Sequence, residues 1–319
     1  ASQKSLNSRR ENPNIKVILI AGIRELAVSA RSTGKQTMKK WLLLMLLFAA
    51  FGFRTASAEV LVLVHGYLGT AKSWAEAGVM ARLHQRGFRH AGVLSYGARG
   101  VHVQPVGKET PARPMYTVDL PSQAPIVIQA DWLAAQLREV RRLRPDEPIV
   151  LVAHSAGGIA ARMMLVRHGA LGVDHLITIA TPHFGTGRAV QALQATDGGG
   201  MFGFLRQWAV RRATGDAMYA TVQQSRSVMV DLTPLAPGNL LFWLNQQPHP
   251  DIRYTSIMRI GTFYMPGDHV VPPLSQDLNR APALYGKVTT YSMAQGHLLT
   301  PQDGDLIGNL LAQRSAAEE

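Results

Sequence analysis

Short apolar runs and longer amphipathic stretches alternate along the chain from residue 59 onward. Each apolar run is rich in β-branched or other apolar residues and is bounded by glycine or polar residues, as expected of strands that are buried on both faces. The stretches between them have the length and apolar spacing of helices that cover a sheet. This alternation predicts an α/β fold in which helices flank a mostly parallel central sheet.

The predicted strands share an apolar, β-branched composition and cover residues 60–64, 91–95, 149–153, 175–179, 254–260 and 288–292. The predicted helices share amphipathic spacing and cover residues 71–85, 125–142, 156–167 and 303–314.

One stretch, from about residue 187 to 247, is too long for a plain crossover between two strands. It carries apolar side chains at helical spacing, including Trp208 and Trp243. We interpret this stretch as an inserted helical cap, which would favour substrates with acyl chains. The same pattern is equally typical of the core of an inserted helical subdomain.

The positive charge of the chain is concentrated at its N-terminus. The formal net charge is +12, but residues 1–58 hold ten of the 33 Lys and Arg and two of the 21 Asp and Glu. The remainder therefore has 23 basic and 19 acidic residues and a net charge of only +4. Because this part is only mildly basic, we predict no nucleic-acid partner.

A basic segment, an apolar run and a series of small residues follow one another at residues 38–58. Met38 precedes two lysines, residues 41–53 form the apolar run, and small residues lead to Ala58. Thirteen apolar residues fall short of the roughly 20 that a membrane-spanning helix needs. We therefore predict a secretory signal peptide that is cleaved after Ala58, and a periplasmic or secreted protein. An uncleaved membrane anchor and a buried helix are the alternatives.

With a start at residue 38, residues 1–37 are an upstream extension that we expect to be unstructured. Their Arg- and Ser-containing, acid-poor composition also permits an organellar targeting segment. The folded domain is then predicted over residues 59–319.

Ser155 stands at the point where an apolar strand changes into a helix, in the segment Val-Leu-Val-Ala-His-Ser-Ala-Gly-Gly at residues 150–158. So sharp a turn requires small neighbours two residues to either side, and these are Ala153 and Gly157. The segment resembles the nucleophile elbow of α/β-hydrolases, with Ala153 in place of the usual first glycine. A serine among small residues after a strand is also typical of a helix N-cap.

The first predicted strand runs into His65-Gly66-Tyr67, a segment similar to the oxyanion loop of lipases and esterases. This resemblance implies that the main-chain N–H groups of Tyr67 and Ala156 form an oxyanion hole. We expect His65 to be a structural residue in the wall of the site.

The same resemblance implies the chain order nucleophile, acid, base. Gly-Asp-His at residues 267–269 and Gly-His-Leu at 296–298 follow the last two predicted strands and resemble the acid and histidine loops of the family. The resemblance implies a catalytic triad of Ser155, Asp268 and His297, in which His297 moves the proton and Asp268 orients its ring. His269 is an alternative base, and either residue taken alone could be an ordinary loop residue.

Two further histidines lie near the predicted site. His183 belongs to Thr-Pro-His-Phe-Gly at residues 181–185, which resembles a segment of the branch containing triacylglycerol lipases and PGAP-type deacylases. This resemblance implies that His183 lines the wall of the site. We expect His154 to pack or form a hydrogen bond beneath the elbow.

Together these features predict a serine hydrolase of carboxylic esters, a lipase or esterase acting on acyl-chain substrates through an acyl-enzyme. The alternatives are an acyltransferase or amidase, and a non-catalytic or membrane-tethered binding protein with the same fold. The chain has no cysteine, which excludes disulfide bonds and catalysis by a thiol. We predict no cofactor and no metal site. The resemblance to lipases leaves a structural calcium open, but the spacing of Asp231, Asp277 and Asp303 identifies no set of ligands. The expected partners are an ester or lipid substrate and, transiently, a membrane or lipid interface.

Overall fold

The computed structural model of the protein describes residues 59–107, 111–197, 212, 215–262 and 267–318. These residues belong to one unit, Ala56–Glu319. The predicted upstream extension and signal peptide lie outside the described residues, as does part of the predicted cap, including Trp208.

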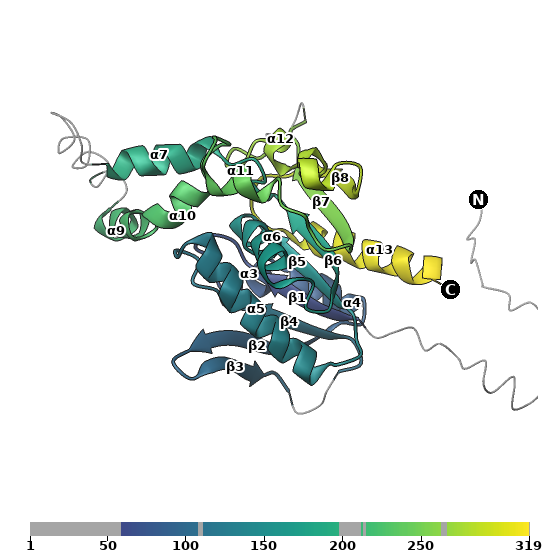
Figure 1. Cartoon of the computed structure of the whole chain (residues 1–319). Coiled ribbons are helices and arrows are strands. Elements are labelled where there is room, and N and C mark those ends of the chain that lie inside the picture. Colours follow the sequence, from purple (N-terminus) through teal and green to yellow (C-terminus); the bar gives the residue numbers. More distant parts are fainter. Residues whose placement is uncertain (1–58, 108–110, 198–211, 213–214, 263–266, 319) are drawn as a thin grey trace, which may run out of the picture. The chain divides into compact units, whose positions relative to one another are not determined.

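The strands form one sheet, which has eight strands within the described residues, in the order β3-β2-β4-β1-β5-β6-β7-β8 (Figure 1). The pair β2–β3 is antiparallel and every other neighbouring pair is parallel. The predicted mostly parallel sheet flanked by helices is therefore confirmed. The strands are β1 (Val60–Val64), β2 (Arg89–Gly97), β3 (Gly100–Pro105), β4 (Pro114–Val118), β5 (Ile149–His154), β6 (Val173–Ile179), β7 (Arg253–Arg259) and β8 (Val288–Met293).

Two helical layers cover the sheet, and alternate residues of β1 face them. Val60, Val62 and Val64 pack with α5 (Ile126–Leu143) and α6 (Ala156–His168). Leu61 and Leu63 face the opposite side, where α4 (Val79–Gln85) packs with α13 (Pro301–Glu318). This two-residue period, with every β1 residue fully buried, explains why the strand consists of apolar residues alone.

Two regions differ from the sequence predictions. The predicted helix 71–85 is divided into α3 (Ser73–Glu76) and α4, because Gly78 adopts a left-handed φ of 75° between them. The strands β3 and β4 were not predicted. They form, with β2, the outer part of the sheet, and β3 is an edge strand with half of its residues exposed.

Four helices lie in the described part of the stretch predicted as a cap. Of these, α7 (Gly187–Thr196), α9 (Asp216–Gln224) and α10 (Arg226–Asp231) contact one another, and α11 (Leu240–Leu244) contacts α6. Between β7 and β8 lie the short helix α12 (Pro273–Gln276) and two 3-10 turns, Leu278–Arg280 and Pro282–Leu284. No helix in the described ranges is both long and apolar enough to cross a membrane.

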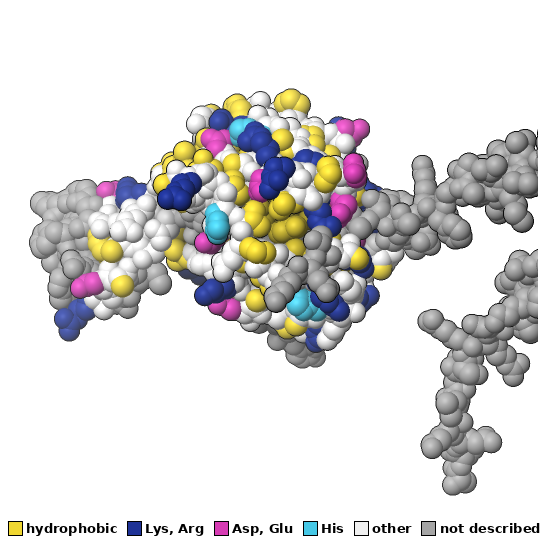
Figure 2. Space-filling view, turned by 90° about the horizontal axis from the view of Figure 1, so that it is seen from below, with side chains coloured by type: hydrophobic (Ala, Val, Ile, Leu, Met, Phe, Trp, Pro, Cys, Tyr) yellow, Lys and Arg dark blue, Asp and Glu magenta, His cyan; other side chains and the backbone are white. Residues whose placement is uncertain are grey.

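Hydrophobic side chains gather near the middle of the molecular surface when it is seen from below, with Lys and Arg side chains around them (Figure 2). This side includes the β2–β3 edge of the sheet. There, a shallow hollow of about 460 Å³ is lined by Val101, Val103, Val106 and Leu143.

The carboxyl ends of the parallel strands meet at the opposite edge from their amino ends. The segments after β1, β5, β7 and β8 all leave from this edge, and they carry Tyr67, Ser155, Asp268 and His297 respectively. The topology alone therefore brings these four segments of the sequence to one place.

Candidate active site

Ser155 occupies a strained turn between β5 and α6. Its φ and ψ are 53° and −130°, a conformation that side-chain-bearing residues rarely adopt. Its N–H donates to the backbone oxygen of Ile179 at 2.8 Å. A Cβ atom on Gly157 would lie 2.2 Å from the backbone oxygen of His65, so only glycine lets the helix pass this close to the loop after β1.

Three side chains from three separate loops form a continuous chain of hydrogen bonds. Ser155 Oγ lies 2.9 Å from Nε2 of His297, and Nδ1 of His297 lies 2.7 Å from Oδ2 of Asp268. A carboxylate only accepts, so Nδ1 carries the ring proton and Nε2 presents its lone pair to the serine hydroxyl. This is the arrangement needed for His297 to take a proton from Ser155.

Asp268 is held in its charged form. Burial by itself raises the pKa of this carboxyl, but the hydrogen bond from His297 and those from the backbone of Val271 and Val270 outweigh it, and the net shift is downward. Both N–H groups donate to Oδ1, at 2.8 Å and 2.7 Å. A charged Asp268 stabilises the imidazolium that forms when His297 takes up a proton.

The loop after β1 presents the Gly66–Tyr67 peptide beside Ser155. The carbonyl of Gly66 accepts from His65 Nδ1 at 2.9 Å and from the N–H of Gly69 at 3.0 Å. In a trans peptide the next N–H points the opposite way, so these two bonds fix the direction of the Tyr67 N–H. A Cβ atom on Gly66 would lie 2.8 Å from Cβ of Ser155, which shows how closely the loop approaches the serine.

Two backbone donors remain available at this point. Among the described residues, the N–H groups of Tyr67 and Ala156 have no acceptor. Ala156 begins α6, so its N–H also lies at the positive end of a helix dipole. Two such donors beside the serine are suited to stabilise negative charge on a substrate carbonyl oxygen.

His65 is buried and both of its ring nitrogens are used. Nδ1 donates to Gly66, and Nε2 accepts from the N–H of Leu120 at 3.0 Å. The ring therefore joins the Gly66 carbonyl to the backbone of Leu120.

His183 is fully buried within a polar network and reaches no open surface. Its Nε2 lies 3.2 Å from Thr178 Oγ1, and its Nδ1 lies 3.4 Å from Nη1 of Arg162, which also donates to Asn245 at 2.9 Å. Burial lowers the pKa of His183 well below its ordinary value, so the ring is neutral. In the structure the ring of His183 contacts Thr178 of β6 and Arg162 of α6, and its backbone oxygen accepts from Asn245, which follows α11.

His154 and His269 have different surroundings. Nε2 of His154 donates to the backbone oxygen of His297 at 2.9 Å, and burial lowers its pKa to about 3. His269 is exposed, and its backbone oxygen accepts from Arg188. In this geometry His297, and not His269, bridges Ser155 and Asp268.

The sequence also matches a family model, described as the alpha/beta hydrolase family, over residues 61–305. The chain belongs to the α/β-hydrolase family. A comparison with curated proteins finds no match.

Among solved structures, this α/β-hydrolase resembles the product of the gene lin2722 from Listeria innocua, with a TM-score of 0.52, 15% identity and coverage of 78% of this chain and 92% of that one. The mature lipase BlEst2 of Bacillus licheniformis is 19% identical, covering 82% and 93% of the two chains at a TM-score of 0.47. An esterase (EaEST) from Exiguobacterium antarcticum is 15% identical. The match covers 82% of this chain and 92% of that one, with a TM-score of 0.47. At 15% identity the similarity to the Listeria innocua protein concerns the fold alone. The other two similarities have TM-scores below 0.5 and carry no conclusion about this chain.

Sequence reasoning missed a buried ion pair that contacts the loop of His297. Arg259 is fully buried, and its Nη2 pairs with Oδ1 of Asp303 at 2.6 Å. Its Nη1 donates to Gln295, two residues before His297, at 2.9 Å. An arginine inside a predicted buried strand was the signal that could have identified this ion pair.

No group of three or more His, Cys, Asp or Glu side chains is placed to hold a metal ion in the part of the hydrolase that the structure describes. Three acids that could have suggested calcium have other partners. Asp231 accepts from the N–H of Ile126, Asp277 accepts from that of Asn279, and Asp303 pairs with Arg259.

Proposed function

We propose that this α/β-hydrolase cleaves carboxylic esters, with Ser155 as nucleophile, His297 as general base and acid, and Asp268 as the carboxylate that orients and stabilises the imidazole. The observation that carries the proposal is the continuous hydrogen-bonded chain from Ser155 through His297 to Asp268. The strained elbow and the two backbone donors beside it support the same assignment.

In the acylation half, Ser155 Oγ attacks the ester carbonyl carbon while its proton passes to Nε2 of His297. The N–H groups of Tyr67 and Ala156 then bind the oxyanion of the tetrahedral intermediate. These two hydrogen bonds stabilise it by on the order of several kcal/mol. As the C–O bond breaks, His297 returns the proton to the leaving alcohol, and the acyl group remains on Ser155. In the second half a water attacks the acyl carbon while His297 takes its proton. As the bond between the acyl carbon and Ser155 Oγ breaks, His297 returns this proton to Oγ, and the acid is released.

Acyl-chain substrates are favoured by exposed apolar side chains in the loops that carry the candidate site residues. Leu68, Val270 and Leu298 are 42%, 39% and 75% exposed, and each follows a residue of the predicted site within two positions. Large apolar side chains that stay exposed around a reactive centre are suited to hold an acyl chain or to touch a lipid interface. We propose a lipase or esterase over an amidase on this ground.

Export follows as a proposal from residues 38–58, whose sequence supports a cleaved signal peptide and a periplasmic or secreted location. The mass of the mature N-terminus tests it. A chain that begins at Glu59 supports cleavage, whereas a chain that retains residues 38–58 supports the membrane-anchored alternative.

Hydrolysis of p-nitrophenyl esters of increasing acyl length tests the proposed activity. The matched pair is Ser155→Ala and Ser225→Ala. Ser225 is also buried, lies between α9 and α10, and donates from Oγ to the carbonyl of Thr221. We expect Ser225→Ala to retain hydrolysis and Ser155→Ala to lose it. Equal hydrolysis by both variants contradicts the proposal, and the preferred chain length separates an esterase from a lipase.

A further inference from the structure

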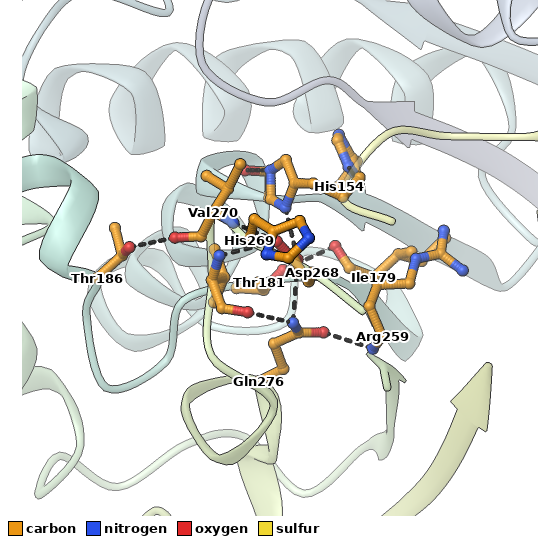
Figure 3. A network of polar contacts seen from close by, with 12 residues as sticks. His154, Ile179, Thr181, Thr186, Arg259, Asp268, His269, Val270 and Gln276 are labelled. Atoms are coloured by element: carbon orange, nitrogen blue, oxygen red, sulfur yellow. Dashed lines mark hydrogen bonds and ion pairs between the residues drawn. The ribbon is translucent and has the colours of Figure 1, made fainter. Parts of the chain in front are cut away.

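Gln276 lies directly behind the acid of the triad. It is the last residue of α12 and is only 1% exposed. Its backbone oxygen accepts from Oγ of Ser256 on β7, which fixes the end of α12 against the sheet. Its side chain extends between Arg259 and Asp268 (Figure 3).

The orientation of the Gln276 amide is determined by its neighbours. The backbone N–H of Arg259, 2.7 Å away, can only donate, so the atom that faces it is the amide oxygen. The amide nitrogen then faces Oδ2 of Asp268 at 3.0 Å and the backbone oxygen of Val271 at 2.7 Å, which both only accept. A single orientation of the Gln276 amide therefore satisfies all three of these hydrogen bonds.

The oxygen that Gln276 contacts is the same Oδ2 that accepts from His297 Nδ1. A second donor on one carboxylate oxygen withdraws electron density from the first hydrogen bond. Resting on the proposed function, we propose that Gln276 is a positioning residue that fixes Oδ2 of Asp268 toward His297 and moderates the strength of the Asp268–His297 hydrogen bond.

Arg259 extends this support to the base. Its backbone N–H fixes Gln276, while its guanidinium donates to Gln295 and pairs with Asp303. Asp303 in turn accepts from the N–H of Thr300, three residues after His297. Arg259, the last residue of β7, is thus connected both to the loop of the acid, through Gln276, and to the loop of the base, through Gln295 and Asp303.

A neutral donor is required at this position. Methionine has a similar volume but cannot donate to Asp268 or accept from Arg259. Glutamate keeps the shape and the acceptor, but it places a second carboxyl group against Asp268 and can donate only while it is protonated. The two substitutions therefore separate loss of the donor from loss of packing.

The test is proton NMR of the full chain, following the strongly downfield resonance of the His297 Nδ1 proton, together with the pH profile of kcat/KM. The variants are Gln276→Met and Gln276→Glu. The matched control is Gln129→Met, because Gln129 is 2% exposed and also donates from Nε2 to two acceptors, the carbonyls of Ser122 and Ala124.

We expect Gln276→Met to move the resonance further downfield, to shift the acidic limb of the profile upward by about one pH unit, and to lower kcat roughly tenfold. Gln129→Met leaves the resonance and the limb in place, whatever it does to thermal stability. If Gln276→Met does not fold, Gln276→Glu decides, because its resonance should acquire a pH-dependent step that the parent lacks.

A resonance that is unchanged in both Gln276 variants overturns the proposal. The NMR readout does not depend on ester turnover, so the two proposals can fail separately. A shifted resonance in a protein that hydrolyses no ester leaves the role of Gln276 intact and removes the proposed function. Ester hydrolysis by a protein whose resonance does not move in the Gln276 variants leaves the proposed function intact and removes the role of Gln276.

Discussion

Nε2 of His154 lies 2.9 Å from the backbone oxygen of His297, while the next residue, Ser155, contacts the ring of the same histidine. Two consecutive residues of the elbow therefore hold His297 by its backbone and by its side chain. Because burial lowers the pKa of His154 to about 3, its ring is neutral at neutral pH, and the single proton is on Nε2, which faces a carbonyl oxygen that can only accept. His154 thus fixes the histidine loop without taking part in proton transfer.

The first prediction concerns this contact. His154→Leu removes the donor and should lower kcat roughly tenfold, the value of one lost hydrogen bond expressed in the transition state. His154→Gln keeps an N–H at a similar distance from the backbone and should retain most of the activity. Steady-state kinetics with a short-chain ester measure both. An equal loss of kcat in the two variants would show that His154 contributes through the packing of its ring and not through its hydrogen bond.

The second prediction concerns the closeness of α6 to the loop after β1. Gly157→Ala should cost about 2–4 kcal/mol of stability or displace the elbow, because the new Cβ would lie 2.2 Å from the backbone oxygen of His65. Gly97 has open space around its Cβ position, so Gly97→Ala is the matched control and should be nearly neutral. Urea unfolding gives both values. Similar stabilities for the two variants would contradict the close approach.

The third prediction concerns the buried ion pair of Arg259 and Asp303. Asp303→Ala leaves Arg259 charged, fully buried and without its carboxylate, and should cost about 3–5 kcal/mol. The double variant Arg259→Met, Asp303→Leu should be less destabilised, because it removes both charges. Thermal unfolding of the single and double variants tests this order, and a double variant less stable than the single one would refute it.

The fourth prediction is loss of stability in mild acid. Burial lowers the pKa of His154 to about 3 and that of His175 to about 4, below the ordinary value of 6.5. Unfolding therefore takes up protons between pH 6.5 and 4, so this stability is fully present above pH 6.5 and is lost as the pH falls. Urea unfolding across this range should show decreasing stability, with a shallower slope in His175→Phe. A constant stability from pH 6.5 to 4 would rule out neutral buried rings.

The parallel sheet could be predicted because its central strands are apolar on both faces, so each run of β1 or β5 is visible without knowledge of its neighbours. Strand β3 could not, because its residues are exposed or half-buried and include His102 and Gln104. Its position depends on pairing with β2, which is a tertiary property.

The same distinction applies to the candidate site. Ser155, Asp268 and His297 each occupy a short local pattern after a strand, so sequence and chain order were sufficient to select them. Gln276 has no local pattern, and its proximity to Asp268 depends on how α12 folds back against β7. The burial of His183 could not be predicted from the sequence either, because it depends on a contact with Arg162 of α6.

The most direct test of the proposed chemistry is covalent labelling with a fluorophosphonate, with the modified residue located by peptide mass spectrometry. We expect a single adduct on Ser155, which is lost in Ser155→Ala and forms much more slowly in His297→Ala, while Ser225→Ala is labelled like the parent. An unlabelled parent, or an adduct on any other residue that persists in Ser155→Ala, would contradict it.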